Sequence, residues 1–372
     1  MNALTRVREQ LVPFAYSAWS AVSSGFLGFI PSPSARCLEI IFFNLASRTV
    51  FSEISVMQTR PLGKTGLNIS IVSYGAASIG NEYGNLDEAQ GIRSLHVALD
   101  GGVNFIDTSP YYGRTLSEKV LGKAFKEIRR DRFILGTKCG RYDVDKFDFS
   151  AERVTRSVDE SLQRMGVSYL DIIQCHDIEF GSLDQVVNEA LPALRNLQKQ
   201  GKVRFVGVTG FPLKIFKYIL DRTELDCILS YCHYSLNNTS LLGLIPYLKS
   251  KRVGIMNASP FSERLLTRQP LPTWHHAPPI LRQYCRQAVE HCDRKGVDIA
   301  KLAIQFCLQD LDITTTVAGT TNPTNMANIL KWIEEPLDPE LLAEVQRILE
   351  PVKNVLWPVG RPENSENQEA GL

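Results

Sequence analysis

The sequence predicts a (β/α)8 barrel, and three observations support this prediction. Short apolar runs alternate with amphipathic stretches of helical period from residue 71 to residue 349, as in a parallel sheet whose strands are joined by helices. Several of these runs end at an ionisable or hydrogen-bonding residue. The run at 103–107 is also followed by a Pro-containing loop with Tyr111 and Tyr112. Catalytic groups of a (β/α)8 barrel gather at the carboxyl ends of its strands, so the pattern also indicates where the site lies.

Local signals define the first half of the barrel. Residues 60–70 place Lys-Thr-Gly between two β-prone runs and predict a hairpin that plugs the floor of the barrel. A Gly-Gly pair ends the helix expected at 86–99 and leads into the strand at 103–107. Ser150 is the expected N-cap of an amphipathic helix. The elements expected in this half are strands at residues 71–76, 103–107 and 133–137 and helices at residues 86–99, 117–125 and 150–165.

The second half is read in the same way. Gly201 ends the helix expected at 182–199, and Pro212 stands at the permissive first turn of the next helix. A long Pro-rich loop at 260–280 follows the seventh strand, and loops of that length usually bind or cover ligands. The elements expected here are strands at residues 169–175, 203–208, 227–229, 253–256 and 314–318 and helices at residues 182–199, 212–222, 241–251, 281–295, 300–308, from 323 onward and at 339–349.

The chain is expected to contain one catalytic domain with an extension at each end. Residues 1–56 lie outside the alternating pattern. Their uncharged run is interrupted by Pro and Gly, which argues against a spanning helix and favours a disordered or a targeting segment. The barrel is expected to cover residues 57–358, and the polar residues 359–372 are expected to form a disordered tail.

Composition limits the possible classes of function. The 372 residues include 41 Lys and Arg and 40 Asp and Glu, so a net charge of +1 provides no field that favours nucleic acid or a membrane surface. The eight cysteines contain no CxxC pair, and Cys175 and Cys227 lie in apolar runs. Reduced thiols of this kind predict a cytoplasmic location, or an organelle if residues 1–56 are a targeting segment. No spacing of His, Cys, Asp and Glu resembles a zinc site, so no metal is expected.

Four residues at the exits of neighbouring strands form the predicted catalytic set: Asp107, Tyr112, Lys138 and His176. A phenol has an unperturbed pKa of about 10 and becomes useful near neutral pH when an ammonium lies against it. Asp107 is expected to hold Lys138 charged, and His176 is expected to orient a substrate oxygen. Taken alone, such an Asp is more often a helix cap, such a Lys a solvated side chain and such a His a core residue. The four together, in this order, favour proton transfer.

The chain lacks the glycine motifs of the common nucleotide folds. No GxGxxG follows a strand and no GxxxxGK[ST] is present, so a Rossmann or P-loop domain is not expected. Residues 319–322, Gly-Thr-Thr-Asn, precede the last barrel helix near strand eight, where barrels often hold phosphate. We therefore expect a nicotinamide cofactor across the barrel mouth; the alternative is that this segment is an ordinary turn and cap.

Three motifs that contain the catalytic set resemble the aldo-keto reductases, a family of NAD(P)-dependent (β/α)8 oxidoreductases. They are DTSPYYG with Asp107 and Tyr112, TKCGR with Lys138, and QCHDIEFGSLDQ with His176. The resemblance covers residues 58–358. It implies that these four residues are the family's tetrad and that Tyr112 is the proton donor or acceptor.

Longer runs, among them TSPYYGRTLSEKVLGK, CGRYDVDKFDFSAERV and ILSYCHYSL, resemble sugar-oxidising members of the family. This implies that an aldose, L-galactose or a related sugar, is oxidised at C1 to the lactone. The hydride would pass to NAD+ and the anomeric hydroxyl proton to Tyr112. The residues expected to bind the sugar hydroxyls are Arg141, Asp177, His233 and Trp274, and further donors and acceptors are available at Tyr142, Glu179 and Asn237.

The resemblance also implies a cofactor site. Its expected residues are Thr209, Gly210, Tyr231, Ser259, Pro260, Gly319, Thr320, Thr321, Asn325 and Asn328. Ala258 stands where many members place an aromatic residue against the nicotinamide, so Tyr231 or Tyr234 is expected to stack instead. The run at 319–330 has no cation where NADP-preferring members use Lys and Arg, so NAD is expected over NADP. An arginine from the loop at 260–280 would reverse that preference.

Two alternatives remain open at this stage. An NADPH-dependent aldehyde or ketone reductase would use the same four residues. A non-catalytic, cofactor-sensing subunit would use residues 1–56 as an interaction arm. The expected partner is in each case a small molecule, without nucleic acid or membrane, and the expected state is a monomer or a dimer.

Overall fold

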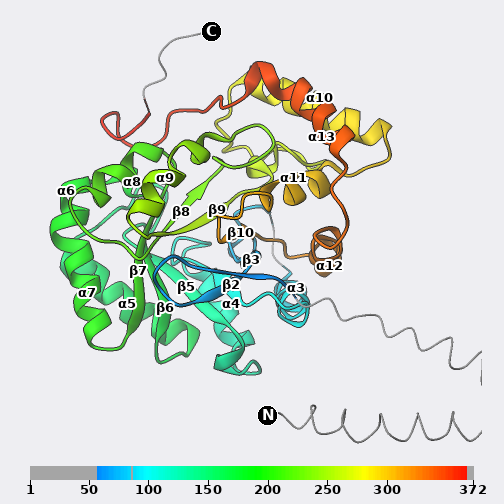
Figure 1. Ribbon diagram of the computed structural model, residues 1–372. Coiled ribbons are helices and arrows are strands. Elements are labelled where there is room, and N and C mark those ends of the chain that lie inside the picture. Colours follow the sequence, from blue (N-terminus) through cyan, green and yellow to red (C-terminus); the bar gives the residue numbers. More distant parts are fainter. Residues whose placement is uncertain (1–56, 85–86, 367–372) are drawn as a thin grey trace, which may run out of the picture. The chain divides into compact units, whose positions relative to one another are not determined.

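A closed barrel of eight parallel strands forms the centre of the computed structural model, which describes residues 57–84 and 87–366 (Figure 1). The strands are hydrogen-bonded in the order β10-β3-β4-β5-β6-β7-β8-β9, so neighbours in the chain are neighbours in the sheet. The predicted (β/α)8 barrel is therefore confirmed. The expectations for residues 1–56 lie outside the described residues.

The barrel strands are short and almost completely buried, as a parallel sheet covered by helices requires. They are β3 (Val72–Gly75), β4 (Phe105–Asp107), β5 (Ile134–Cys139), β6 (Leu170–Cys175), β7 (Val203–Gly210), β8 (Cys227–Tyr231), β9 (Gly254–Ala258) and β10 (Thr315–Ala318). Each of the eight predicted strands overlaps one of these.

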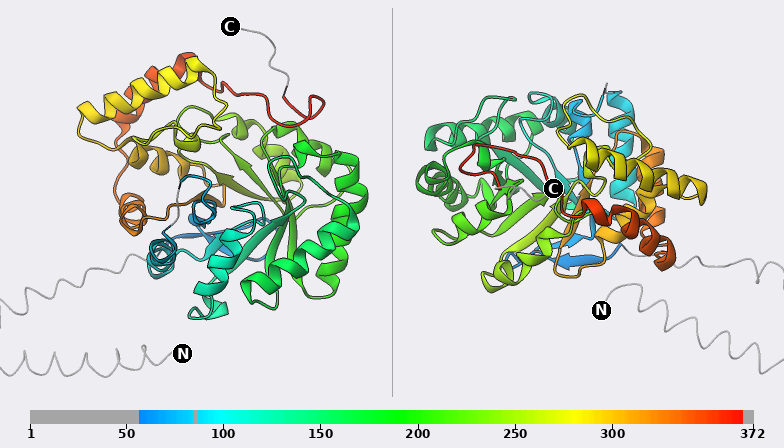
Figure 2. Two further views of the ribbon diagram at one scale, coloured as in Figure 1. Left: turned by 180° about the vertical axis from the view of Figure 1, so that it is seen from behind. Right: turned by 90° about the horizontal axis from the view of Figure 1, so that it is seen from above.

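Helices surround the barrel and alternate with its strands (Figures 1 and 2). They are α3 (Glu88–Asp100), α4 (Leu116–Ala124), α5 (Ala151–Met165), α6 (Leu183–Gln185), α7 (Leu191–Lys199), α8 (Leu213–Leu220), α9 (Ile245–Ser250), α10 (Pro279–Arg294), α11 (Ile299–Cys307), α12 (Pro323–Trp332) and α13 (Pro339–Leu349). The predicted cap is confirmed, because the Ser150 side chain accepts a hydrogen bond from the Arg153 N–H. No helix in the described part of the chain is long and apolar enough to cross a membrane.

Two predicted helices are interrupted, and a proline accompanies each interruption. The helix expected at 182–199 consists of α6, a π-helical turn at Val186–Ala190 and α7, which has Pro192 in its first turn. The helix expected at 241–251 begins as a 3-10 turn and continues as α9, with Pro246 at its start. Proline cannot donate the i→i−4 hydrogen bond, so the backbone changes its turn where the proline enters.

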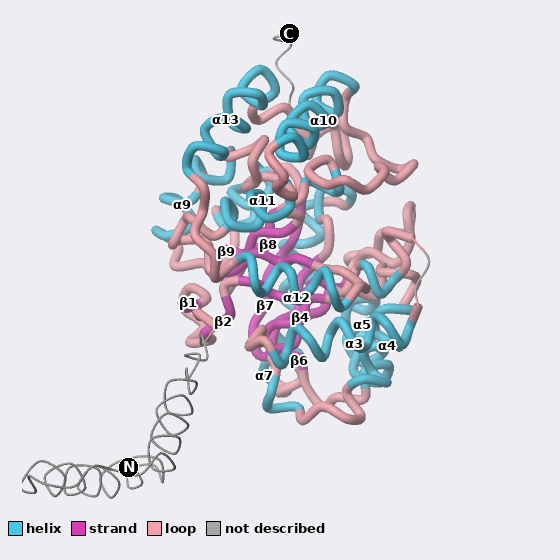
Figure 3. The backbone as a smooth tube through the Cα atoms, turned by 90° about the vertical axis from the view of Figure 1, so that its right-hand side faces the viewer, coloured by secondary structure: helices cyan, strands magenta, loops and turns pink. Residues whose placement is uncertain are grey.

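The predicted hairpin is formed by β1 (Thr59–Pro61) and β2 (Asn68–Ser70), seen beside the barrel in Figure 3. Its apolar residues pack against inward-facing residues of the strands, including Phe105, Ile172 and Met256. The Lys64 N–H donates to the carbonyl of Arg252, just before β9 begins. The hairpin therefore closes the end of the barrel opposite the strand exits.

Arg60 attaches this hairpin to the last barrel unit, and its loss is expected to destabilise the protein. Its guanidinium donates to the carbonyls of Leu308, Asp310 and Ile313, each at 2.7 Å. Hydrogen bonds from a charged donor contribute roughly 1.5–3 kcal/mol each and are not additive, so we expect Arg60→Met to lower the free energy of unfolding by about 3 kcal/mol. Denaturant titration measures this change in the free energy of unfolding. Lys64→Met, which removes an ion pair to an exposed glutamate, is the control and should cost less than about 1 kcal/mol.

The expected disorder of the tail is wrong for residues 359–366. The Asn364 side chain is buried and donates to the carbonyls of Glu179 (2.9 Å) and Gly181 (3.0 Å). The Arg361 N–H also donates to the Glu179 carbonyl at 3.0 Å. These backbone acceptors lie in the loop after β6. The composition of residues 359–366 does not show that such acceptors are available, so it could not predict that this segment is ordered.

Candidate active site

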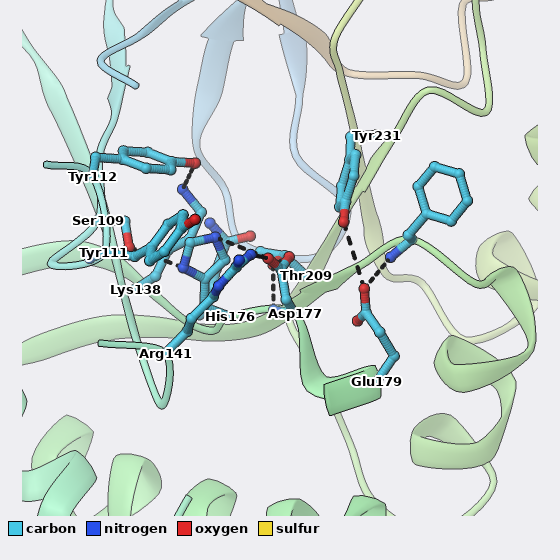
Figure 4. A network of polar contacts seen from close by, with 12 residues as sticks. Ser109, Tyr111, Tyr112, Lys138, Arg141, His176, Asp177, Glu179, Thr209 and Tyr231 are labelled. Carbon is cyan, nitrogen blue, oxygen red and sulfur yellow. Dashed lines mark hydrogen bonds and ion pairs between the residues drawn. The ribbon is translucent and has the colours of Figure 1, made fainter. Parts of the chain in front are cut away.

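The four predicted catalytic residues meet at the carboxyl end of the barrel. Figure 4 shows three of them, Tyr112, Lys138 and His176. Asp107 is the last residue of β4, Lys138 lies near the end of β5, and His176 directly follows β6. These three strands are adjacent in the sheet, so their exits converge. Tyr112 reaches the group from the loop after β4.

The Lys138 ammonium is the centre of this group. Its Nζ donates to Asp107 Oδ2 at 2.6 Å, to the Thr108 carbonyl at 2.9 Å and to the Tyr112 hydroxyl at 3.1 Å. The Lys138 side chain is 1% exposed. All three ammonium protons are therefore directed at partners within the site, and one of them is aimed at the phenol oxygen.

The protonation of Tyr112 differs from the expectation. Burial, and then the charge of Asp107, hold the pKa of Tyr112 well above its usual range, although the Lys138 ammonium favours the phenolate. Burial likewise raises the pKa of Asp107, and the adjacent ammonium opposes that rise. The phenol is therefore neutral at physiological pH in this site, and it does not titrate near neutrality as the sequence suggested.

His176 is also neutral. Burial lowers the pKa of its imidazole to about 3. Its Nδ1 lies 2.9 Å from the Ser109 hydroxyl, and its ring meets the Tyr112 ring edge to face with centroids 5.6 Å apart. A neutral imidazole beside a phenol can orient a hydroxyl or carbonyl oxygen without competing for the proton.

Arg141 and Asp177, predicted to bind substrate, form a buried ion pair at the edge of this group (Figure 4). The guanidinium lies over the Tyr111 ring at 3.7 Å from its centroid. The Asp177 N–H donates to the hydroxyl of Thr209, a predicted cofactor residue, at 3.0 Å. The loop after β6 therefore contacts Thr209 as well as Arg141. The ion pair links the exits of β5, β6 and β7.

Comparison with known proteins identifies the family. The family profile described as "Aldo/keto reductase family" matches residues 72–350. The chain belongs to the aldo/keto reductase family. This membership confirms a nicotinamide-dependent oxidoreductase, because the family uses that cofactor.

Several relatives in this family are dehydrogenases of sugars. The chain is 49% identical over 317 residues to "L-galactose dehydrogenase" of Arabidopsis thaliana, which covers 83% of this chain and 99% of that protein. It is 32% identical over 258 residues to "D-arabinose 1-dehydrogenase" of Saccharomyces cerevisiae, covering 65% of this chain and 76% of that protein. A holo aldo-keto reductase from Bacillus halodurans has the same fold with a TM-score of 0.67 at 24% identity, covering 83% of this chain and 99% of that one.

Two other predicted substrate residues of this aldo/keto reductase differ in their accessibility. His233 is fully buried, its Nδ1 lies 2.7 Å from the Tyr231 carbonyl, and its ring packs on Phe211. It therefore lies within the wall of the site. Trp274 is 40% exposed, and its indole N–H donates to the Glu82 carbonyl at 3.3 Å. That contact joins the long loop after β9 to the loop after β3.

Tyr231 is the more accessible of the two rings expected against the nicotinamide. Tyr234 is buried and stacks on Phe306, so its ring belongs to the core. Tyr231 is only partly buried and is paired with Ala258 in the β8–β9 register. A ring from β8 is therefore adjacent to the position on β9 where the family's aromatic residue is missing.

The remaining predicted cofactor residues lie on the loops after β9 and β10, on α12 and at the end of β7. Ser259 and Pro260 follow β9, and Ser259 has a positive φ of 57°. Gly319 to Thr321 connect β10 to α12, whose first turn holds no acidic residue and is capped by Asn322. Asn325 is exposed and Asn328 is partly exposed on α12. Gly210 ends β7.

Sequence reasoning missed Ser109 and Tyr111, which contact His176 and Arg141. Both lie inside the DTSPYYG motif, so the motif itself was the available signal. Within the described residues, no group of three or more His, Cys, Asp and Glu is placed to hold a metal ion.

Proposed function

We propose that this protein oxidises an aldose, L-galactose or a related sugar, at C1 to the lactone with NAD+. The observation that carries the proposal is the buried Lys138 ammonium aimed at the Tyr112 hydroxyl beside a neutral His176. Membership of the aldo/keto reductase family supports the redox chemistry. The printed names of the two sugar dehydrogenases among its relatives support the substrate class.

In the proposed mechanism, each residue acts on the anomeric hydroxyl in one defined way. The imidazole of His176 orients the hydroxyl oxygen. Tyr112 takes the hydroxyl proton at its own oxygen, and the Lys138 ammonium stabilises the phenolate that can accept it. Asp107 holds that ammonium in place. A bound nicotinamide supplies the hydride acceptor. Because the phenol is neutral at rest, oxidation is expected to accelerate as the pH rises into the alkaline range.

The residues present fit a dinucleotide. The first turn of α12 holds no acidic side chain, so no carboxylate opposes the positive end of the helix dipole there, which suits a phosphate. Tyr231 offers a partly exposed ring for the nicotinamide. The Ser230 hydroxyl beside it is buried without a hydrogen-bond partner among the described residues. We assign Ser259, Pro260, Thr320 and Thr321 to the groups between these two ends.

NAD+ is expected to be preferred over NADP+ by at least about tenfold in kcat/KM. A 2′-phosphate needs a guanidinium or ammonium partner, and the loop before α12 provides none. The arginines of the long loop are occupied elsewhere: Arg264 donates to the Tyr83 carbonyl, and Arg268 pairs with Asp293 at 2.6 Å. The measurement is kcat/KM for each cofactor with one good aldose, repeated for Asn325→Arg, which should improve the use of NADP+.

Gln346→Arg, which adds the same charge on the exposed face of α13, is the control and should leave the cofactor ratio unchanged. Equal or better use of NADP+ by the unmodified protein would contradict the assignment of this loop.

The proposed activity itself is tested by steady-state assays of the purified protein. L-galactose, L-fucose and D-arabinose with NAD+ are compared with aromatic aldehydes and NADPH. We expect the highest kcat/KM with one of the sugars. Faster turnover of the aldehydes would favour the reductase alternative, and cofactor binding without turnover of any substrate would favour a non-catalytic subunit.

A further inference from the structure

Glu179 is a buried carboxyl group in the wall of the site that the mechanism does not use. It lies in the 3-10 turn after β6 (Ile178–Phe180) and is 0% exposed. Its Oε1 accepts the Phe211 N–H at 3.0 Å. The same oxygen accepts the Tyr231 hydroxyl at the long distance of 3.5 Å (Figure 4). Its Oε2 is buried without a hydrogen-bond partner among the described residues.

The backbone around this carboxyl is shaped to hold it. A Cβ on Gly210 would lie 2.6 Å from Glu179 Oε2. Because Gly210 has no side chain, the Glu179 carboxyl can occupy this space. Gly360 has a φ of +84°, and a Cβ there would lie 2.6 Å from Glu179 Cγ. The C-terminal segment also supplies two donors to the Glu179 carbonyl, from Arg361 and Asn364. The end of β7 and the C-terminal segment thus hold both the side chain and the main chain of Glu179 in place.

Glu179 connects the parts of the wall that face the proposed nicotinamide. The Phe211 N–H that it accepts belongs to the residue following β7, and the Phe211 ring packs on Tyr231 with centroids 5.3 Å apart. Trp357 covers the Phe211 ring at 5.1 Å. A change in the position of this carboxyl would therefore move both the exit of β7 and the Tyr231 ring.

We propose that Glu179 is a positioning residue that sets the Tyr231 ring and the exit of β7 for the nicotinamide. The inference rests on the proposed use of Tyr231 as the stacking ring. It differs from a role in contacting sugar hydroxyls, which the sequence alone also allowed. With no exposed oxygen, the carboxyl has no surface to offer a sugar.

The carboxyl is held in its neutral form. Burial, and then the charge of Asp177, raise the pKa of Glu179 well above its usual range. The titratable and charged groups that face it from the surrounding elements are Arg141, Asp177, Tyr231 and Arg361. A neutral acid keeps one oxygen as an acceptor for the Phe211 N–H, and a glutamine side chain would do the same.

The test compares Glu179→Ala with Glu179→Gln in the full-length protein. NADH affinity is measured by fluorescence titration without sugar, and KM is measured for NAD+ and for one good aldose. We expect Glu179→Ala to weaken NADH binding about tenfold, which is the effect of roughly one lost hydrogen bond, and to raise KM for NAD+ while KM for the sugar stays within about twofold. Glu179→Gln should restore NADH affinity to within about threefold. Asp184→Ala is the control, because it removes an exposed carboxylate that accepts a tyrosine hydroxyl outside the site.

A second readout is thermal stability against pH. The folded state holds a proton on Glu179 that the unfolded chain releases above about pH 4.5, so this group's contribution to stability falls as the pH rises towards the folded pKa. Glu179→Gln has no such proton. Its Tm relative to the unmodified protein is therefore expected to increase as the pH rises above about 4.5.

The outcomes separate the inference from the proposed function. A raised sugar KM with unchanged NADH affinity, or Glu179→Gln as weak in NADH binding as Glu179→Ala, would overturn the positioning role. If Glu179→Ala does not fold, Tyr231→Phe decides, because it keeps the ring and removes the hydroxyl. It should weaken NADH binding about twofold to threefold, both alone and in Glu179→Gln, whose amide oxygen keeps the same acceptor; NADH binding left unchanged by Tyr231→Phe would overturn the inference. The NADH measurements need no aldose, so they remain valid if the sugar activity fails.

Discussion

Tyr112→Phe is expected to lower kcat for aldose oxidation by roughly 10²–10⁴-fold, the usual contribution of a general acid or base. The substitution removes only the phenol oxygen that lies 3.1 Å from Lys138 Nζ. The ring and its edge-to-face contact with His176 remain, so the site should keep its shape. Cofactor affinity should be nearly unchanged, because the proposed dinucleotide contacts lie on other loops.

Two measurements test this expectation. Steady-state kinetics give kcat, and NADH fluorescence titration gives the affinity of the same sample. Tyr247→Phe removes a tyrosine hydroxyl that donates to Asp221 on the surface, and it should be indistinguishable from the unmodified protein. A Tyr112→Phe variant with near-normal kcat would refute the assignment of the proton-transfer residue.

Lys138→Met is expected to reduce oxidation by roughly 10²–10³-fold at each pH below the pKa of Tyr112. An ammonium about 3 to 4 Å from a phenol oxygen stabilises the phenolate by about 4 kcal/mol at an effective dielectric constant near 20, or about three pKa units. Its removal raises the already elevated pKa of Tyr112 further, so less phenolate is available to accept the proton. The alkaline rise in kcat should therefore move to higher pH.

The shape of the pH profile distinguishes this electrostatic effect from a loss of structure. We expect Lys138→Met to remain folded, because its neighbour Asp107, whose pKa is already raised by burial, can take up a proton when the ammonium is gone. Lys123→Met, which removes an exposed pair with Glu88, is the control. A Lys138→Met variant with reduced rate but an unshifted pH profile would show that Lys138 does not act on the phenol.

Several features could be predicted from sequence because they depend on short-range patterns. The hairpin and the eight strands follow from apolar runs and turn residues, and the Ser150 cap follows from its position before an amphipathic helix. The meeting of Asp107, Lys138 and His176 could also be predicted, since the exits of consecutive parallel strands in a barrel lie side by side.

Other features were beyond the sequence because they depend on what packs against each group. Residues 359–366 are held on the loop after β6 by hydrogen bonds from Asn364 to the Glu179 and Gly181 carbonyls. The contacts of Arg264 and Arg268 likewise depend on residues far along the chain, the Tyr83 carbonyl and the Asp293 carboxylate. No local pattern reports these contacts.

The sequence by itself determined the barrel, the order of its units and the residue types that gather at the strand exits. Only the tertiary structure decided how those residues are charged. Tyr112, His176 and Glu179 are each buried far enough that the cost of desolvating a charge outweighs the opposite charges nearby, so all three are neutral. Desolvation depends on every atom that excludes water from a group, and those atoms come from segments that are far apart in the chain.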